Sequence, residues 1–250
     1  MKILVIGDSC EDIFIYGNCN RLAPAAPVPV FVEEYRKSNK GMAGNVFENV
    51  ISLGYPCTII TNKAEITKTR YVEKKTNHML VRVDSSEEKI DRIENIDPEE
   101  LQKYAAIIIS DYNKGFLLEE DIQFIAKNHE LVFLDTKKLL GTWAKDLNFI
   151  KINEQEYERT KHLLTGEDDG LDEKLIVPVG SGGCIYDGEI YPVSKVEIKD
   201  LTGAGDSFLA ALTCRFIQSK DIIKSIEYAN ECATRVVQQK GVNTVYVNDV

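Results

Sequence analysis

Short apolar runs alternate with polar loops and helix-like stretches along most of the chain, and this alternation constrains the fold more than any other feature. The runs with the length of buried strands are residues 2–6, 57–61, 105–110, 131–134, 149–152, 174–179 and 190–198. Continuously apolar strands are typical of parallel sheets that are covered on both faces. Strands that alternate with helices form such sheets through right-handed crossovers. The sequence therefore predicts an α/β fold with a mostly parallel central sheet flanked by helices.

Length, charge and cysteine usage narrow the class of protein. The 250 residues are enough for one large domain with an ample core, so we expect a single domain over residues 1–250. No apolar run approaches the roughly 20 residues that span a bilayer, and the chain enters a strand directly without a signal peptide. Six scattered cysteines without a C-x-x-C pair indicate reduced thiols and a cytoplasmic protein.

The net charge of −10 argues against nucleic acid or an anionic membrane as a partner. A cleft that binds phosphates would then need local Lys and Arg residues together with Mg²⁺ to reverse the field. We therefore expect small molecules to be the partners.

The stretch at residues 200–206, Asp-Leu-Thr-Gly-Ala-Gly-Asp, combines an anion-binding helix start with a carboxylate. Gly203, Ala204 and Gly205 are predicted to form the first turn of a helix, whose free N–H groups and dipole attract a phosphate. Asp206 would repel that phosphate unless it accepts a proton from an attacking hydroxyl. This pairing predicts phosphoryl transfer to an alcohol. The alternative is a strand-to-helix turn with a capping Asp.

Polar residues at two other positions are candidates for binding a polyol. Asp8 and Asp12 follow the first strand, and carboxylates hydrogen-bond neighbouring hydroxyls well. Gly41 and Asn45 lie at a predicted helix start, where small residues let a ligand approach and Asn offers a donor and an acceptor. Ordinary turn and cap chemistry explains these residues equally well.

Two further segments have two interpretations each. The glycines at 180–183 indicate either a phosphate loop or the turn of a hairpin whose second strand is 184–186. The alternating run at 28–32 contains Pro29, which confines it to a sheet edge and suggests a lid. A predicted hairpin at 69–83 carries basic residues, which form either a solvated face or a binding surface.

The chain resembles the ribokinase (PfkB-type) family of sugar kinases, whose signature D-T-x-G-A-G-D is close to residues 200–206. The resemblance covers essentially the whole chain. Within the family it is most similar to the kinases of D-glycero-D-manno-heptose 7-phosphate, which share A-P-V-P-V and S-D-Y-x-K-G stretches. The matching stretches are 7–12, 21–30, 41–46, 67–70, 110–115 and 153–156. The resemblance implies a three-layer ribokinase-like fold with a small β lid at about 13–38 and 69–83. It also implies transfer of a phosphoryl group from ATP, with Mg²⁺, to the 1-hydroxyl of that heptose, as in ADP-heptose synthesis.

The resemblance also implies roles for individual residues. Asp206 would be the base, and Gly203, Ala204 and Gly205 would hold the charge on the transferred group. Residues expected at the nucleotide and metal are Asn153, Glu156, Gly180, Gly183, Thr202, Asn230 and Gly241, with Asn153 and Glu156 organising Mg²⁺. Residues expected at the sugar or its phosphate are Asp8, Asp12, Gly41, Asn45, Lys68, Arg70, Asp111 and Lys114. Lid strands of this family often pair across a dimer, so a homodimer is expected.

The chain departs from the family pattern in places that bear on substrate choice. Met42 replaces a glycine, Ala23 and Ala25 replace a Ser and a Glu, and Pro178 replaces a Thr. The segments 62–66 and 165–173 are short, and no nucleotidyltransferase domain is expected to be fused. Two alternatives therefore remain open: a PfkB-type kinase of another sugar, sugar phosphate or nucleoside, or a catalytically silent sugar- or nucleotide-binding protein. A nicotinamide dehydrogenase is disfavoured because no G-x-G-x-x-G follows the first strand.

Overall fold

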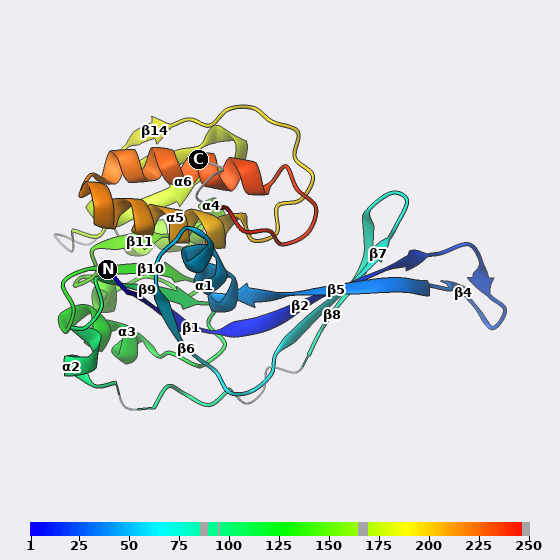
Figure 1. The fold of residues 1–250 in the computed structure, drawn as a ribbon, viewed down its shortest axis with the longest axis horizontal. Helices are drawn as coiled ribbons and strands as arrows, with labels where there is room; N and C mark the ends of the chain where they lie inside the picture. Colours follow the sequence, from blue (N-terminus) through cyan, green and yellow to red (C-terminus); the bar gives the residue numbers. More distant parts are fainter. Residues whose placement is uncertain (86–89, 95, 165–169, 247–250) are drawn as a thin grey trace.

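One large sheet forms the centre of the molecule in the computed structural model, which describes residues 1–85, 90–94, 96–164 and 170–246 (Figure 1). Its strand order is β14-β13-β12-β11-β10-β9-β1-β6, and the six strands from β12 to β6 are parallel. The bounds are β1 Ile3–Gly7, β6 Cys57–Thr61, β9 Ala106–Asp111, β10 Val132–Thr136, β11 Phe149–Lys151, β12 Leu175–Pro178, β13 Cys184–Tyr186 and β14 Glu189–Tyr191. β13 pairs antiparallel with both β12 and β14. The predicted mostly parallel sheet is confirmed.

Helices cover both faces of this sheet and make the three layers. On one face, Ile3 and Val5 pack in a core with α1 (Ala43–Ser52), α5 (Ala204–Ser219) and α6 (Ile222–Val236). On the other, Leu4 and Ile6 pack in a second core with α2 (Pro98–Leu101) and α3 (Glu119–Lys127). α4 (Glu154–Thr160) follows β11. Successive side chains of β1 thus point to opposite cores, which explains why its sequence is apolar without alternation.

A second sheet projects from this body as the lid (Figure 1). Its order is β5-β2-β7-β8, with β2 Ser9–Asn18, β5 Val32–Met42, β7 Thr67–Glu73 and β8 His78–Asp84. β3 (Leu22–Ala23) and β4 (Ala26–Pro29) pair at its far end. The expected β lid is therefore present, and its strands reach the body at both β2 and β5.

Gly7 explains how the lid joins the sheet so closely. A Cβ atom at Gly7 would lie 1.9 Å from the carbonyl oxygen of Ser110 on the neighbouring strand β9. Any larger residue would therefore push β1 and β9 apart. With glycine there, Asp8 alone separates β1 from β2, and its side chain stays at the carboxyl end of the sheet.

The structure differs from the predictions in three places. The run at 190–198 is a strand only to Tyr191, because Pro192 lacks the N–H for a ladder and the following apolar residues line a cavity instead. The β lid is expected to begin at about residue 13, but its first strand, β2, already begins at Ser9. Apolar spacing predicts a last helix over residues 221–239 that is capped by Gly241, but α6 ends at Val236 and Gly241 donates its N–H to Asp200 Oδ2 at 3.0 Å.

The glycines at 180–183 form the turn between the antiparallel strands β12 and β13, so the hairpin is confirmed. Most of the short segment 165–173 lies outside the described residues. None of the helices in the described ranges is long and apolar enough to cross a bilayer.

Candidate active site

Asp206 lies in the first turn of α5, held between α1 and the loop after β9. Its Oδ2 accepts a hydrogen bond from Asn45 Nδ2 at 2.9 Å, and its Oδ1 accepts one from the Tyr112 hydroxyl at 2.8 Å. Burial raises the pKa of Asp206 to about 6, and the Asp135 charge adds to this, although the two hydrogen bonds and Lys151 oppose it. A carboxylate with a pKa near 6 is ionised at neutral pH and basic enough to take a proton.

The start of α5 has the open backbone that the sequence predicts. Gly203 is the N-cap with φ +83°, and a Cβ there would lie 2.8 Å from Asn45 Nδ2. A Cβ at Gly205 would lie 2.9 Å from Lys151 Nζ. Glycine at both positions therefore lets Asn45 and Lys151 reach the helix start, where backbone N–H groups and the dipole favour an anion.

Lys151 and Asp135 form a buried ion pair that the sequence analysis missed. Lys151 Nζ lies 2.6 Å from Asp135 Oδ2, and the two residues belong to adjacent strands, β11 and β10. Because Lys151 also borders Gly205, it adds a positive charge to the helix start. A lysine at the end of an otherwise apolar strand, two residues before the N-x-x-E stretch, is the sequence signal that could have revealed it.

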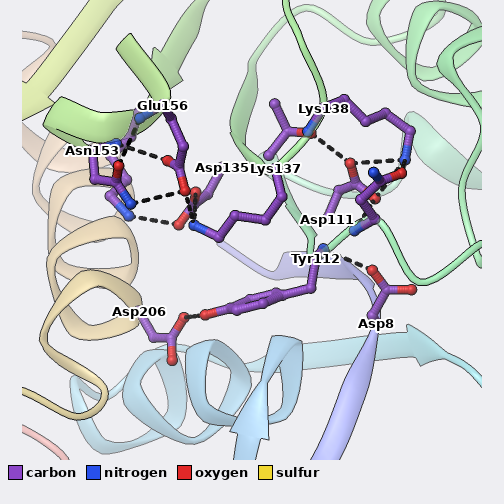
Figure 2. A network of polar contacts seen from close by, with 12 residues as sticks. Asp8, Asp111, Tyr112, Asp135, Lys137, Lys138, Asn153, Glu156 and Asp206 are labelled. Atoms are coloured by element: carbon purple, nitrogen blue, oxygen red, sulfur yellow. Dashed lines mark hydrogen bonds and ion pairs between the residues drawn. The ribbon is translucent and has the colours of Figure 1, made fainter. Parts of the chain in front are cut away.

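Asn153 and Glu156 hold each other at the start of α4. Asn153 N donates to Glu156 Oε2 at 2.8 Å, and Glu156 N donates to Asn153 Oδ1 at 2.9 Å, which is a capping box. Lys137 contacts Glu156 Oε1 and lies 3.8 Å from Asp135 Oδ1 (Figure 2). Burial lowers the pKa of Lys137, but the Asp135 and Glu156 carboxylates outweigh it and raise the pKa overall.

A cation fits between these carboxylates. No group of three or more His, Cys, Asp or Glu side chains within the described ranges is arranged to hold a metal. Mg²⁺ needs fewer protein ligands than such a group provides, because it is often held by one or two carboxylates together with water and phosphate oxygens. Asp135 Oδ1 is buried with no hydrogen-bond partner among the described residues, and the Lys137 ammonium already stands between it and Glu156. Glu156 and Asp135 are thus suitable for Mg²⁺.

Asp8 and Asp206 lie on opposite sides of Tyr112 (Figure 2). Asp8 Oδ2 accepts hydrogen bonds from the backbone N–H groups of Tyr112 at 2.7 Å and Lys114 at 3.4 Å. Burial, and then the nearby charge of Asp111, raise its pKa. Its Oδ1 is buried without a partner in the part of the chain that the structure describes. An unpaired buried acceptor is costly, so this oxygen is suited to a ligand hydroxyl.

Several residues that are predicted to bind the sugar or its phosphate form hydrogen bonds or ion pairs with other residues of the protein. Arg70 pairs with Asp12, and a Cβ at Gly41 would lie 2.2 Å from Asp12 Oδ2. Asp111 accepts from Lys138 Nζ at 2.9 and 3.0 Å. Gly41 is therefore needed for the position of Asp12, while ligand contacts of Asp12, Arg70 and Asp111 stay predictions.

Lys68 reaches from the lid into the cleft. Its Nζ lies 5.3 Å from the centre of the Tyr112 ring and 3.3 Å from Met42 Sδ. Lys114 contributes its backbone N–H to Asp8, and a role for its side chain stays a prediction.

A cavity of about 460 Å³ lies on the other side of the α5 start. Of the predicted nucleotide residues, Gly180, Gly183 and Asn230 line it, together with Ala204 and Gly205. Its walls are otherwise mostly apolar, which suits a flat aromatic ring. The apolar wall residues are Val193, Val196, Ile198, Leu201, Phe208 and Val237.

Thr202 and Gly241 are not among the residues that line this cavity. Thr202 donates to Asp200 Oδ1 from its N–H at 2.9 Å and its hydroxyl at 2.7 Å, and Gly241 donates to Asp200 Oδ2. Both residues therefore brace the loop before α5, and their contact with a nucleotide stays a prediction.

The arrangement as a whole is a buried carboxylate at a helix start, with a mostly apolar cavity near that helix start and the unpaired Oδ1 of Asp8 on the far side of Tyr112. Comparisons with known proteins identify the family of the chain. Residues 56–248 match the family model described as pfkB family carbohydrate kinase. The bifunctional protein HldE of Helicobacter pylori strain J99 is 31% identical over 96% of this chain, which spans 63% of that protein's length.

Solved structures show the same fold at low sequence identity. The ribokinase of Thermotoga maritima superposes with a TM-score of 0.74 at 16% identity, covering 100% of this chain and 97% of its own. The ribokinase of Arabidopsis thaliana, solved with ribose and ATP, gives a TM-score of 0.70 at 15% identity and covers 99% and 95%. The fold is therefore ribokinase-like, and the chain belongs to the pfkB family of carbohydrate kinases, which transfer a phosphoryl group to an alcohol.

Proposed function

We propose that this protein is an ATP- and Mg²⁺-dependent kinase that phosphorylates the 1-hydroxyl of D-glycero-D-manno-heptose 7-phosphate. The observation that carries the proposal is the buried Asp206, whose pKa of about 6 suits a base and which lies in the first turn of α5. A carboxylate beside an anion-binding helix start is the pairing that phosphoryl transfer to an alcohol requires.

In the proposed reaction, the acceptor hydroxyl donates to Asp206 Oδ1 and gives its proton to that oxygen. Its oxygen bonds to the γ-phosphorus while the bond to the β–γ bridging oxygen breaks, and ADP leaves. General-base assistance of this kind contributes about 10²–10⁴ in rate. The backbone N–H groups at Ala204 and Gly205 and the ammonium of Lys151 hold the charge of the moving phosphoryl group. Asn45 keeps Asp206 in place through its 2.9 Å hydrogen bond.

The cavity beside α5 is proposed to hold the adenine of ATP, with Gly180, Gly183 and Asn230 on its walls. Gly205 lines this cavity and directly precedes Asp206 in the first turn of α5, which supports a triphosphate lying along the helix start. Mg²⁺, when bound, would neutralise phosphate charge, and Glu156 and Asp135 would hold it, with Asn153 orienting Glu156.

The heptose assignment is supported by the A-P-V-P-V and S-D-Y-x-K-G stretches and by the similarity to bifunctional protein HldE. Asp8 Oδ1 offers an unpaired acceptor for a sugar hydroxyl, and Lys68 offers a cation for a remote phosphate. A second candidate is a kinase of another sugar, sugar phosphate or nucleoside. It is favoured by Met42, which is buried and touches Lys68, so it narrows the space where the acceptor would lie.

A homodimer through the lid is part of the proposal. Several apolar side chains of the lid are largely exposed, namely Val28, Val32, Met79, Val81 and Val83. Exposed apolar strand faces usually mark a contact surface. We also place the protein in the cytoplasm, because all six cysteines are free.

A panel of acceptors tests the proposal, with ADP release from Mg-ATP as the readout. The panel contains the heptose 7-phosphate, a hexose 6-phosphate, ribose and a nucleoside. We expect the highest kcat/KM with the heptose phosphate, and a higher value with another acceptor would replace this assignment by the second candidate.

Asp206→Asn is the companion variant, with Asp187→Asn at an exposed turn as its matched control. We expect Asp206→Asn to lose a factor of about 10²–10⁴ in kcat with ATP binding retained, while the control keeps full activity. Undiminished turnover in Asp206→Asn would refute the kinase mechanism. ATP binding without transfer to any acceptor in the unmodified protein would favour a silent binding protein.

A further inference from the structure

Tyr112 spans the cleft from the sugar end to the base. Its backbone N–H donates to Asp8 Oδ2 at 2.7 Å, and its hydroxyl donates to Asp206 Oδ1 at 2.8 Å. Figure 2 shows the ring lying between the two carboxylates. The side chain thus joins the two acidic residues that the proposed reaction assigns to opposite ends of the acceptor.

The Tyr112 hydroxyl donates to Asp206 Oδ1, the carboxylate oxygen to which the hydroxyl of an acceptor sugar would have to donate. Asp206 Oδ2 accepts from the Asn45 amide, and Oδ1, which the proposed reaction assigns to the acceptor hydroxyl, accepts from the Tyr112 hydroxyl. A phenol O–H is a donor of the same kind as a sugar O–H or water. The phenol does not replace them as a nucleophile, because burial and the Asp206 charge hold its pKa well above the ordinary value. Tyr112 and the acceptor therefore compete for one atom.

We propose that Tyr112 is a gate on Asp206, whose phenol keeps water from the base until an acceptor hydroxyl displaces it. This inference rests on the proposed function, because it gives Asp206 the role of base. The side reaction that the gate prevents is hydrolysis of ATP. A water oxygen would bond to the γ-phosphorus, the bond to the β–γ bridging oxygen would break, and Asp206 would take the water proton, releasing ADP and phosphate. Kinases have to suppress this reaction, and excluding water from the site is the general means.

The surroundings of the ring link the gate to acceptor binding. Lys68 Nζ from the lid lies 5.3 Å from the ring centre, and Lys137 Nζ from the loop after β10 lies 5.2 Å from it. Cation–π contacts of this length hold the ring in place. Lys68 is also a residue proposed for the acceptor's phosphate. An acceptor that draws Lys68 to its phosphate would remove one of the two contacts, and its hydroxyl could then replace the phenol.

The test measures ADP release from Mg-ATP without any acceptor. Tyr112→Phe removes only the hydroxyl, and we expect acceptor-independent ADP release to rise about tenfold. The matched control is Tyr55→Phe, which removes a phenol that donates to the Cys214 carbonyl at 3.1 Å outside the cleft, and we expect no change. Adding Asp206→Asn to Tyr112→Phe should return hydrolysis to background, because the base is then absent.

A pH profile provides a second readout that a purely structural role would not move. The groups that set the Asp206 pKa are Asn45 on α1, Tyr112, Asp135 on β10 and Lys151 on β11. The Tyr112 hydrogen bond lowers that pKa, so Tyr112→Phe should move the acidic limb of activity to higher pH. Tyr112→Leu, which also removes the ring, should raise hydrolysis too, so a folding defect in one variant does not decide the result.

The outcomes separate this inference from the proposed function. Unchanged or lower hydrolysis in both folded Tyr112 variants would overturn the gate, whatever acceptor the enzyme uses. Loss of acceptor turnover without a rise in hydrolysis would also overturn it, and would make Tyr112 a positioning residue. If no acceptor is phosphorylated by the unmodified protein while Tyr112→Phe hydrolyses ATP through Asp206, the gate stands and the acceptor assignment fails.

Discussion

The body and the lid hold their charged groups in different ways. In the body, Lys151 and Asp135 pair at the carboxyl ends of two buried strands, and their side chains are 6% and 2% exposed. In the lid, β8 is exposed along its whole length and β5 is exposed from residue 32 to residue 40. The lid's own buried pair, Arg70 and Asp12, lies where β2 and β7 approach the body. The proposed base and its neighbours thus lie in a buried core, while the proposed acceptor contact of Lys68 belongs to a sheet with two largely exposed strands.

The largest expected effect comes from breaking the body pair. Lys151→Met removes the 2.6 Å partner of the buried Asp135 carboxylate and leaves only Lys137, whose Nζ lies 3.8 Å from Asp135 Oδ1. We expect a loss of about 3 kcal/mol in the free energy of unfolding. Arg70→Met breaks the corresponding pair in the lid and should lower the free energy of unfolding by less. The side chains of Arg70 and Asp12 are 12% and 8% exposed, so water can approach Asp12 more easily. Urea unfolding of the two variants measures the difference. Equal losses would show that the two pairs are equally part of the core.

Substitutions at Met42 test for backbone strain at the point where β5 of the lid ends and α1 begins. Its φ of 60° and ψ of −133° belong to a region that favours glycine, and strain of this kind costs about 1–3 kcal/mol. We expect Met42→Gly to be more stable than Met42→Ala by about 1–2 kcal/mol, since both lose the side chain and only alanine keeps the strain. The ordinary order, with alanine more stable, is expected for Glu48→Ala against Glu48→Gly in the same helix. Thermal unfolding of the four variants gives the answer, and the same order at both sites would contradict a strained Met42.

The pH dependence of activity is expected to come from Asp206, which belongs to the body. Burial raises the pKa of Asp206 to about 6, so the fraction of ionised base falls as pH drops through 6. We expect kcat/KM to decrease about tenfold per pH unit below that point, with the plateau above it. A profile that stays flat down to pH 4.5 would mean that Asp206 keeps an ordinary pKa or is not the base.

The smallest effect on folding is expected at the exposed face of the lid. Val81 is 51% exposed on β8, so Val81→Lys should change the free energy of unfolding by less than about 0.5 kcal/mol. If the lid forms the proposed dimer, the introduced charge should still shift the protein to monomers in sedimentation experiments. Leu139→Lys, an equally simple change at an exposed residue of the body, is the control and should leave the assembly unchanged.

Much of the fold and part of the site follow from local sequence. β6 lies at the predicted residues 57–61, and α5 starts at the predicted turn. Asn153 was expected at the triphosphate and metal, yet its side chain also caps α4, because the residue types that bind ligands are the ones that cap helices. The start of β2 escaped prediction because its first residues, Ser9 to Asp12, are polar and look like a loop.

The contacts that complete the site lie beyond the reach of sequence patterns. Tyr112 and Asp206 are separated by 94 residues, and Lys151 and Asp135 by 16. Lys151 and Asp135 meet because the parallel strands β11 and β10 end at the same edge of the sheet. Asp206 meets Tyr112 because the start of α5 lies beside the loop that follows β9. The residues of a pair are then neighbours in space without any fixed spacing along the chain.

The sequence by itself determined the layered α/β fold, the helix start at Gly203 and the presence of a carboxylate in it, because apolar periodicity and glycine chemistry act over a few residues. Only the tertiary structure decided which oxygen of Asp206 accepts from Tyr112 and which cation borders the helix start. It also decided that Asp8 keeps one carboxylate oxygen without a hydrogen-bond partner. Those properties depend on burial and on distances between strands, and both are set by packing of segments that are remote in sequence.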